Sequence, residues 1–177
     1  MRDNRPMVRT GVELVGIDDE VLEQLVAAAR LEDSPADVMA PLPGSPGWGP
    51  FAEDAFRQLH RSRRPGLAGP HHEATYAVRT GNQALGVLRL FRPDGADDDS
   101  VLEVGMWLSR LHRGAGIGRA ALLLGVARAR DLGAVELVAD TTATNLAAQA
   151  VLRRAGFVLA EPAGSEPSSV QAARRLR

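Results

Sequence analysis

The chain has 177 residues, 45% of them hydrophobic and 24% charged, a composition typical of one soluble globular domain. Its formal net charge of -1 provides no basic field for nucleic acid or an anionic membrane, and the absence of cysteine excludes disulfides, thiolate metal sites and a cysteine nucleophile. No stretch approaches the ~18 apolar residues of a membrane-spanning helix, and the polar start MRDNRPMVRT has no apolar signal region, so we expect a cytoplasmic protein.

The N-terminal part is expected to hold two helices separated by loops. After a start that is either disordered or an edge strand, residues 18–31 predict a helix, because acidic residues crowd the first turn and apolar residues recur at helical spacing. The Pro- and Gly-rich stretch 39–50, which carries Trp48, predicts a loop. Residues 51–64 predict a second helix, and a further loop follows at 65–70.

The pattern then changes to strands. Residues 74–79 and 85–91 are separated by the turn signal Thr-Gly-Asn-Gln and predict a β-hairpin. An acidic loop, PDGADDD, leads to a strand at 101–108. The remaining expected elements are helix 117–132, strand 135–139, helix 145–155, strand 157–160 and strand 170–176. Helices, then antiparallel strands, then a β-α-β-α-β unit predict one mixed α/β domain over residues 1–177.

A glycine-rich loop joins the strand that ends at Leu-Ser to the long helix after it. Gly114, Gly116 and Gly118 put no side chain between the backbone N–H groups and a bound anion, and the positive end of the helix dipole points to the same place. Arg113 and Arg119 add positive charge on either side. The loop therefore predicts a pyrophosphate site; the alternative is a tight turn that needs glycine for a positive φ.

Two families of cofactor are compatible with such a loop. Gly116-x-Gly118-x-x-Ala121 satisfies the fingerprint of a nicotinamide-dinucleotide oxidoreductase, and Asp140 ends the next strand, where a ribose-binding acid belongs. However, that fold places its fingerprint after the first strand and needs several further βα units. Here an antiparallel hairpin precedes the loop and 37 residues follow Asp140, so the oxidoreductase is the less favoured interpretation.

The other family is indicated by two motifs that occur in the right order. Arg113-x-x-Gly116-x-Gly118 resembles motif A of the GNAT superfamily of N-acetyltransferases, and NLAAQAVLRRAGF, residues 145–157, resembles motif B of the same family. The stretches EVGMWL and AVLRRAGF are similar to the RimJ/RimL branch, which acetylates protein N-termini. The resemblance covers the C-terminal half of the chain, whereas the N-terminal half agrees only in the order of its elements.

The resemblance implies both a fold and an activity. The fold would be a mixed, mostly antiparallel sheet, flanked by helices and splayed between its fourth and fifth strands, with acetyl-CoA in the gap. The activity would be transfer of an acetyl group to a primary amine of a small molecule or a protein N-terminus, without a metal, and a homodimer is compatible with it. The implied cofactor-binding residues are Leu108, Ser109, Arg113, Gly114, Ala115, Gly116, Ile117, Gly118, Arg119 and Asn145.

Direct transfer needs a neutral amine and a donor for the oxyanion. An amine with a pKa near ~10 is mostly protonated at neutral pH, so a general base is useful. Glu103, a carboxylate within an apolar strand, is the first candidate; His72 and Glu73, just before the hairpin, are the second. The oxyanion donor would be a backbone N–H group near residues 107–109, which leaves no side-chain signature. His71 and His72 point to opposite strand faces, which argues against a metal site.

The chain departs from the family at the position of the general acid. Where many relatives have a tyrosine that protonates the leaving thiolate, this chain has Leu152, and the alternative hydroxyl of motif B is replaced by Ala148. Tyr76, the single tyrosine, lies elsewhere. A non-catalytic acyl-CoA-binding module therefore stays open beside the enzyme. The sequence leaves the acceptor amine, the length of the acyl chain and the oligomeric state open.

Overall fold

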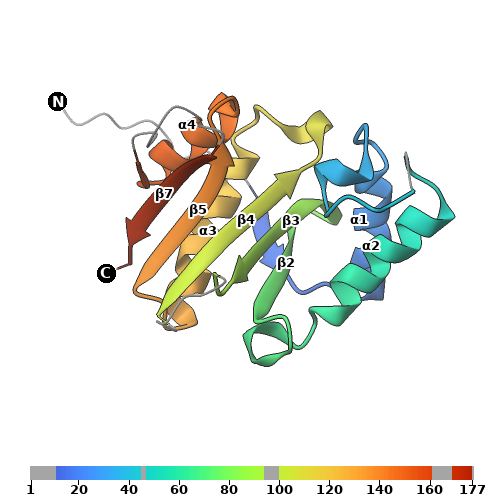
Figure 1. The fold of residues 1–177 in the computed structure, drawn as a ribbon, viewed down its shortest axis with the longest axis horizontal. Coiled ribbons are helices and arrows are strands. Elements are labelled where there is room, and N and C mark those ends of the chain that lie inside the picture. The colour runs from blue at the N-terminus through green and yellow to red at the C-terminus, as the bar shows by residue number, and fades with distance from the viewer. Residues whose placement is uncertain (1–10, 45–46, 94–99, 161–168, 177) are drawn as a thin grey trace.

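The structure of the chain is a computed structural model, and it describes residues 11–44, 47–93, 100–160 and 169–176. Among these residues, seven strands form one sheet in the order β1-β2-β3-β4-β5-β7-β6 (Figure 1). The strands are β1 (Val12–Val15), β2 (Glu73–Thr80), β3 (Gln83–Phe91), β4 (Val101–Leu108), β5 (Glu136–Thr142), β6 (Val158–Leu159) and β7 (Ser169–Arg175). Strand β4 pairs in parallel with β5, and the other described pairs are antiparallel. This is the mixed, mostly antiparallel sheet that the resemblance implied.

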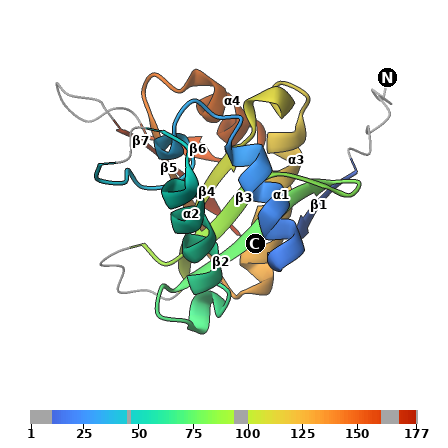
Figure 2. The same cartoon turned by 90° about the vertical axis from the view of Figure 1, so that its right-hand side faces the viewer.

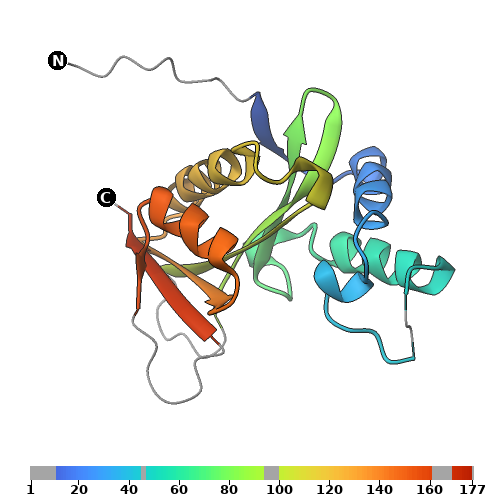
Figure 3. The same ribbon diagram turned by 90° about the horizontal axis from the view of Figure 1, so that it is seen from above.

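In the described part of the chain, four α-helices cover the two faces of the sheet: α1 (Asp19–Ala29), α2 (Pro50–Ser62), α3 (Ile117–Asp131) and α4 (Leu146–Arg154). Seen from above, α1 and α2 lie on one side of the strands, and α3 and α4 lie on the other (Figure 3). The view in Figure 2 shows α1 and α2 next to each other in front of the sheet. Short 3-10 turns follow α1, α2 and β4, at Pro35–Asp37, Gly66–Ala68 and Arg110–His112.

Each face of the sheet has its own hydrophobic core, because successive side chains of a strand point to opposite faces. On the face of α3, residues such as Leu88, Leu102 and Leu122 are buried together. On the face of α1, Leu22, Phe56 and Val87 form the second core. The helices therefore hold the sheet from both sides and fix the position of its strand ends.

Most expected elements are present, and the differences lie at their ends. The edge-strand alternative for the start is confirmed for β1, while residues 1–10 and the acidic run 97–99 fall outside the described residues. Helix α1 begins after Asp18, whose side chain accepts a hydrogen bond from the Val21 N–H group at 2.8 Å and caps the helix. Strand β5 continues to Thr142, three residues beyond the expected end, because those residues pair with β7.

Candidate functional site

Strands β4 and β5 run together at one end and separate at the other. Only Val101–Glu103 of β4 pair with β5, at Glu136–Val138. Beyond this point β4 pairs with β3 alone and β5 with β7 alone, so the two carboxyl ends diverge (Figure 1). The parallel edge of β4 from residue 104 to residue 108 is left without a strand partner. Ligands in α/β sheets bind at such crevices beyond the carboxyl ends of strands.

The hydrogen bonding between β3 and β4 determines which backbone groups face this gap. The Ser109 N–H group donates to the Leu85 carbonyl oxygen at 2.8 Å, and Gly86 lies opposite Leu108. In an antiparallel ladder, hydrogen-bonded and non-hydrogen-bonded pairs alternate. The backbone groups of Leu108 and Met106 therefore point away from β3, towards the side where β5 has diverged. Of these groups the Leu108 carbonyl oxygen accepts from Arg113 Nε at 2.8 Å, and the Leu108 N–H group and the backbone of Met106 are available to a ligand that lies along β4.

The glycine loop lies between the end of β4 and the start of α3. Gly114 and Gly116 have φ angles of 82° and 81°, the left-handed conformation that favours glycine. Within the described part of the chain, no backbone carbonyl accepts a hydrogen bond from the N–H groups of residues 114–119. These groups belong to the loop and to the first turn of α3, where the helix dipole is positive. The loop thus has the properties of an anion site.

The two arginines that flank the loop differ. Arg119 is exposed on the first turn of α3. The guanidinium group of Arg113 is folded back: its Nε donates to the Leu108 carbonyl oxygen and its NH2 donates to Glu32 Oε2, both at 2.8 Å. The guanidinium group of Arg113 is therefore paired with Glu32, while its side chain stays 56% exposed, and a place for it beside the anion stays a prediction.

Two further expected cofactor residues have part of their hydrogen-bonding capacity in use. The Oδ1 atom of Asn145 accepts from the Ala148 N–H group at 3.1 Å and caps α4. Ser109 uses its N–H group on Leu85, and its carbonyl accepts from the His112 N–H group at 2.9 Å. Its fully buried hydroxyl has no partner among the described residues. The hydroxyl of Ser109 is thus enclosed by protein, and its backbone groups are used within the chain.

The candidate bases lie on the face of the sheet that α1 and α2 cover. Glu103 is half-buried at the last position where β4 pairs with β5. Trp107, four residues further along β4, points to the same face and packs against the core there. Phe91 lies between Glu103 and Glu73 in the register of β4, β3 and β2. Glu73 and Glu103 thus lie in one row across β2, β3 and β4, and two strand spacings separate their backbones by about 10 Å.

Glu73 and His72 have other interactions. The Glu73 carboxylate is buried, at 5% exposure, and lies 3.1 Å from Arg63 Nε and 3.8 Å from an Arg89 nitrogen. His72 is exposed, with φ at 47°, and its Nδ1 atom is 3.2 Å from the Leu67 carbonyl oxygen. Of the three candidates, Glu103 is therefore the one beside the diverging strands, and Glu73 is held by arginines.

Two features escaped the sequence analysis. Gly86 lies so close to β4 that a Cβ atom there would be 2.3 Å from the Trp107 carbonyl oxygen. An isolated glycine in a strand is a signal of such a close approach. The second feature is His60 on α2, whose ring meets the Phe56 ring edge to face, with 4.5 Å between ring centres. Burial, with a smaller contribution from nearby arginines, lowers the pKa of His60 to about 4.

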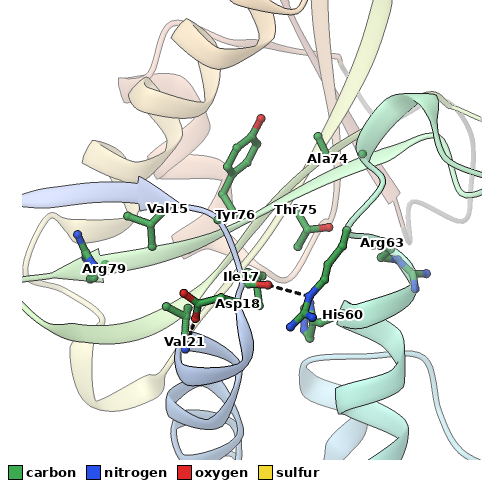
Figure 4. Close-up of a pocket in the computed structure, with 13 residues that line it drawn as sticks. Val15, Ile17, Asp18, Val21, His60, Arg63, Ala74, Thr75, Tyr76 and Arg79 are labelled. Carbon is green, nitrogen blue, oxygen red and sulfur yellow. Dashed lines mark hydrogen bonds between the residues drawn. The ribbon is translucent and has the colours of Figure 1, made fainter.

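A cavity of about 740 Å³ lies away from the gap, at the edge of β2. Figure 4 shows Thr75 of β2, His60 and Arg63 of α2 and Asp18 beside α1 around it. Strand β1 pairs with residues 77–80 only, which leaves the first half of β2 open at this point. The arginines that line the cavity are already paired with acids. The cavity therefore does not share the chemistry of the glycine loop.

Three properties of the site bear on the possible chemistry. The position of the missing tyrosine, Leu152, is a buried part of the core next to β5, and Ala148 stands in the first turn of α4. Among the described residues, no three His, Asp or Glu side chains form a group that could hold a metal ion. No helix in the described part of the chain is long and apolar enough to span a membrane.

Comparisons with known proteins agree with this geometry. The family model described as "Acetyltransferase (GNAT) domain" matches residues 14–158. The fold is similar to RimL, a ribosomal L7/L12 alpha-N-protein acetyltransferase solved with coenzyme A, with a TM-score of 0.70, 21% identity and coverage of 96% of both chains. It is also similar to spermidine N-acetyltransferase from Vibrio cholerae in complex with CoA and spermine, with a TM-score of 0.69, 12% identity and coverage of 94% of this chain and 96% of that chain. A comparison with curated proteins found no match. Because the dinucleotide fold requires a doubly wound parallel sheet, the oxidoreductase alternative is wrong.

Proposed function

Since the chain belongs to the GNAT acetyltransferase family, we propose that it transfers an acetyl group from acetyl-CoA to a primary amine by direct attack. The proposal rests on two features that follow each other along the chain: a strand edge whose backbone can bind amide groups, and a loop that can bind an anion. The open edge of β4 leads from Glu103 to Leu108, and the glycine loop with its unpaired N–H groups begins five residues later. Acetyl-CoA fits this order of features, because its thioester, its long arm with amide groups and its pyrophosphate follow one another in the same order.

The residues present fit acetyl-CoA at both of its ends. Backbone N–H groups from Gly114 to Arg119 bind the pyrophosphate, because glycine and the helix terminus leave them accessible. The backbone of Leu108 binds the pantetheine arm, and the amide nitrogen of Asn145 approaches it from α4. When bound, the cofactor supplies an activated acetyl thioester.

The reacting end lies deeper in the gap, towards Glu103. The Met106 N–H group also faces the gap, and it donates to the carbonyl oxygen as negative charge develops there. Glu103 is three residues away along the strand, about 10 Å at 3.4 Å per residue. At that distance Glu103 takes the proton of the ammonium group through water rather than by direct contact. Glu73 is not assigned this role, because it lies on β2, two strands away from the edge of β4 that borders the gap.

The leaving thiolate needs no side-chain acid in this proposal. A CoA thiol resembles that of cysteine, with a pKa near ~8.5, so expelling the thiolate at pH 7 costs about 2 kcal/mol relative to the thiol. Hydration of the thiolate and its protonation by solvent offset that amount. Leu152, at 6% exposure, therefore serves the packing of α4, and no replacement for the tyrosine is required.

The acceptor approaches from the face of α1 and α2, where Glu103 lies. We propose an amine-bearing small molecule or a protein N-terminus as the acceptor class. The acceptors named for RimL and for spermidine N-acetyltransferase represent these two alternatives. A non-catalytic module that binds acetyl-CoA is the second candidate, favoured by the absence of a hydroxyl at Leu152 and Ala148.

The test combines binding with turnover. Isothermal titration with acetyl-CoA is followed by a panel of polyamines, aminoglycosides and short peptides, with detection of the free thiol. We expect saturable binding and thiol release with at least one amine class. Binding without release on any amine identifies the non-catalytic module, and a wild-type protein that does not bind acetyl-CoA contradicts both candidates.

The role of Glu103 is tested with the active amine. Glu103→Gln should lower kcat/KM by about 10² near neutral pH, with partial recovery at higher pH, where free amine is plentiful. Glu13→Gln, a strand glutamate of β1 at the far edge of the sheet, is the matched control. Wild-type rates across pH in Glu103→Gln would show that the carboxylate is structural.

A further inference from the structure

We propose that Glu32, in the turn after α1, is a positioning residue that holds the cofactor loop in its binding conformation. The proposal rests on the proposed function for the identity of the ligand, but its geometric part concerns the ligand-free chain. Glu32 belongs to neither sequence motif. It lies 81 positions before Arg113 in the sequence, and only the tertiary fold brings the two together.

Glu32 makes two contacts, and both are with the segment between β4 and the glycine loop. Its Oε1 atom accepts from the Arg110 backbone N–H group at 2.8 Å, and its Oε2 atom accepts from Arg113 NH2 at 2.8 Å. One carboxylate thus spans the 3-10 turn at Arg110–His112 from its first residue to the residue after its last. We call Glu32, Arg110 and Arg113 the clasp.

The burial of Glu32 makes the clasp more than a surface ion pair. The side chain is 4% exposed, and a buried carboxylate is tolerated only where charged or hydrogen-bonding partners compensate for its lost hydration. Both partners belong to the loop segment, so the loop cannot move away without leaving a buried charge unpaired. The adjacent Asp33 differs: its side chain is 83% exposed and pairs with the guanidinium group of Arg110 at the surface, where such pairs contribute little.

The clasp also determines how the groups of the glycine loop are placed for a bound anion. Arg113 is held between Glu32 and the Leu108 carbonyl oxygen, so its side chain ties the end of β4 to the start of the loop. Its side chain stays 56% exposed beside the loop, where the N–H groups from Gly114 to Arg119 have no backbone acceptor among the described residues. Positioning of that row is therefore the contribution of Glu32, and it connects the α1 side of the sheet to the donor site.

The test measures the loop with and without ligand. In Glu32→Ala, hydrogen exchange of the ligand-free protein should become at least about 10-fold faster for the Arg110 N–H group, which loses its acceptor, and for the hydrogen-bonded N–H groups of His112 and Arg113 in the same turn. Exchange within α1 should stay unchanged. The dissociation constant for CoA, measured by isothermal titration, should rise by about 10-fold or more. Glu32→Gln, which keeps an oxygen for the Arg110 N–H group, should recover part of both effects, and it replaces Glu32→Ala if the alanine variant does not fold. Asp33→Asn is the control and should change neither quantity.

Two results would overturn the proposal. One is exchange of the Arg110, His112 and Arg113 N–H groups at the wild-type rate in Glu32→Ala. The other is wild-type or tighter affinity for CoA in a variant whose loop exchanges faster, since the loop would then bind without Glu32. If the wild-type protein itself does not bind CoA, the proposed function fails, and the exchange measurement alone decides the role of Glu32 in positioning the loop.

Discussion

Replacing Gly86 with alanine should weaken the binding of CoA, although Gly86 lies outside both motifs and touches no ligand in the proposed function. A Cβ atom at this position would be 2.3 Å from the Trp107 carbonyl oxygen and 2.8 Å from the Leu108 Cα atom. Ordinary contact begins at 3.4 Å, so β4 must move by 3.4 − 2.3, about 1 Å. Both clashing atoms are backbone, which no side-chain rotation relieves.

The magnitude follows from what that shift does to the open edge of β4. Gly86 lies opposite Leu108, the residue whose backbone groups face the gap. A shift of about 1 Å stretches a 2.9 Å hydrogen bond beyond bonding distance and removes about 1.4 kcal/mol, which is tenfold in affinity. The overpacking itself should lower the free energy of unfolding by about 1–3 kcal/mol, and the melting temperature by a few degrees per kcal/mol.

Titration calorimetry with CoA and thermal denaturation are measured on the same preparations. Gly16→Ala is the control, because the space around Gly16 is open and its φ is not positive. Gly86→Ala should bind CoA about 10-fold more weakly, and kcat/KM with the active amine should fall by up to about 10². A folded Gly86→Ala variant with an affinity within twofold of wild type would refute the reasoning, because β4 would then accommodate the methyl group without displacing Leu108.

Three further predictions concern the loop, the buried imidazole and the missing acid. Gly116→Asp places a carboxylate at the anion site and strains a φ of 81°, so the affinity for CoA should fall well over ~10-fold by calorimetry, and unchanged affinity would remove the loop from the site. The pKa of His60 is lowered to about 4 from an unfolded value near ~6.5, so the unfolded chain takes up a proton first as the pH falls. Between these two pH values the free energy of unfolding should drop by about 3 kcal/mol. Urea titrations at pH 7 and pH 4 should show a smaller drop for His60→Leu than for the wild type. An equal drop in both proteins would show that His60 does not titrate as inferred. The pH profile of kcat/KM should rise to a plateau without a basic limb below about pH 9.5, and a basic limb that disappears in Tyr76→Phe would identify a side-chain acid after all.

The local features of the C-terminal half were determined by the sequence. Alternating apolar residues, the turn at 80–83 and the three glycines after β4 predict strand, hairpin and anion loop because each depends on neighbours within a few residues. The order of these elements, with motifs A and B, was enough to indicate the family and the splayed sheet. Element ends were less certain, since pairing with a distant strand, as between β5 and β7, extends an element beyond its local pattern.

Contacts between distant segments were decided only by the tertiary structure. The sequence predicted Arg113 beside the anion, and only the fold showed that Glu32 from the turn after α1 pairs with it. Glu73 and Glu103 became distinguishable once the fold placed Arg63 against the former and the diverging strands beside the latter. The strength of an ionic interaction depends on distance and burial, which are properties of the folded chain and not of residue spacing. The sequence could therefore name the acids and bases of this protein, whereas the packing of α1 and α2 against the sheet decided that Glu73 pairs with Arg63 and that Glu32 pairs with Arg113.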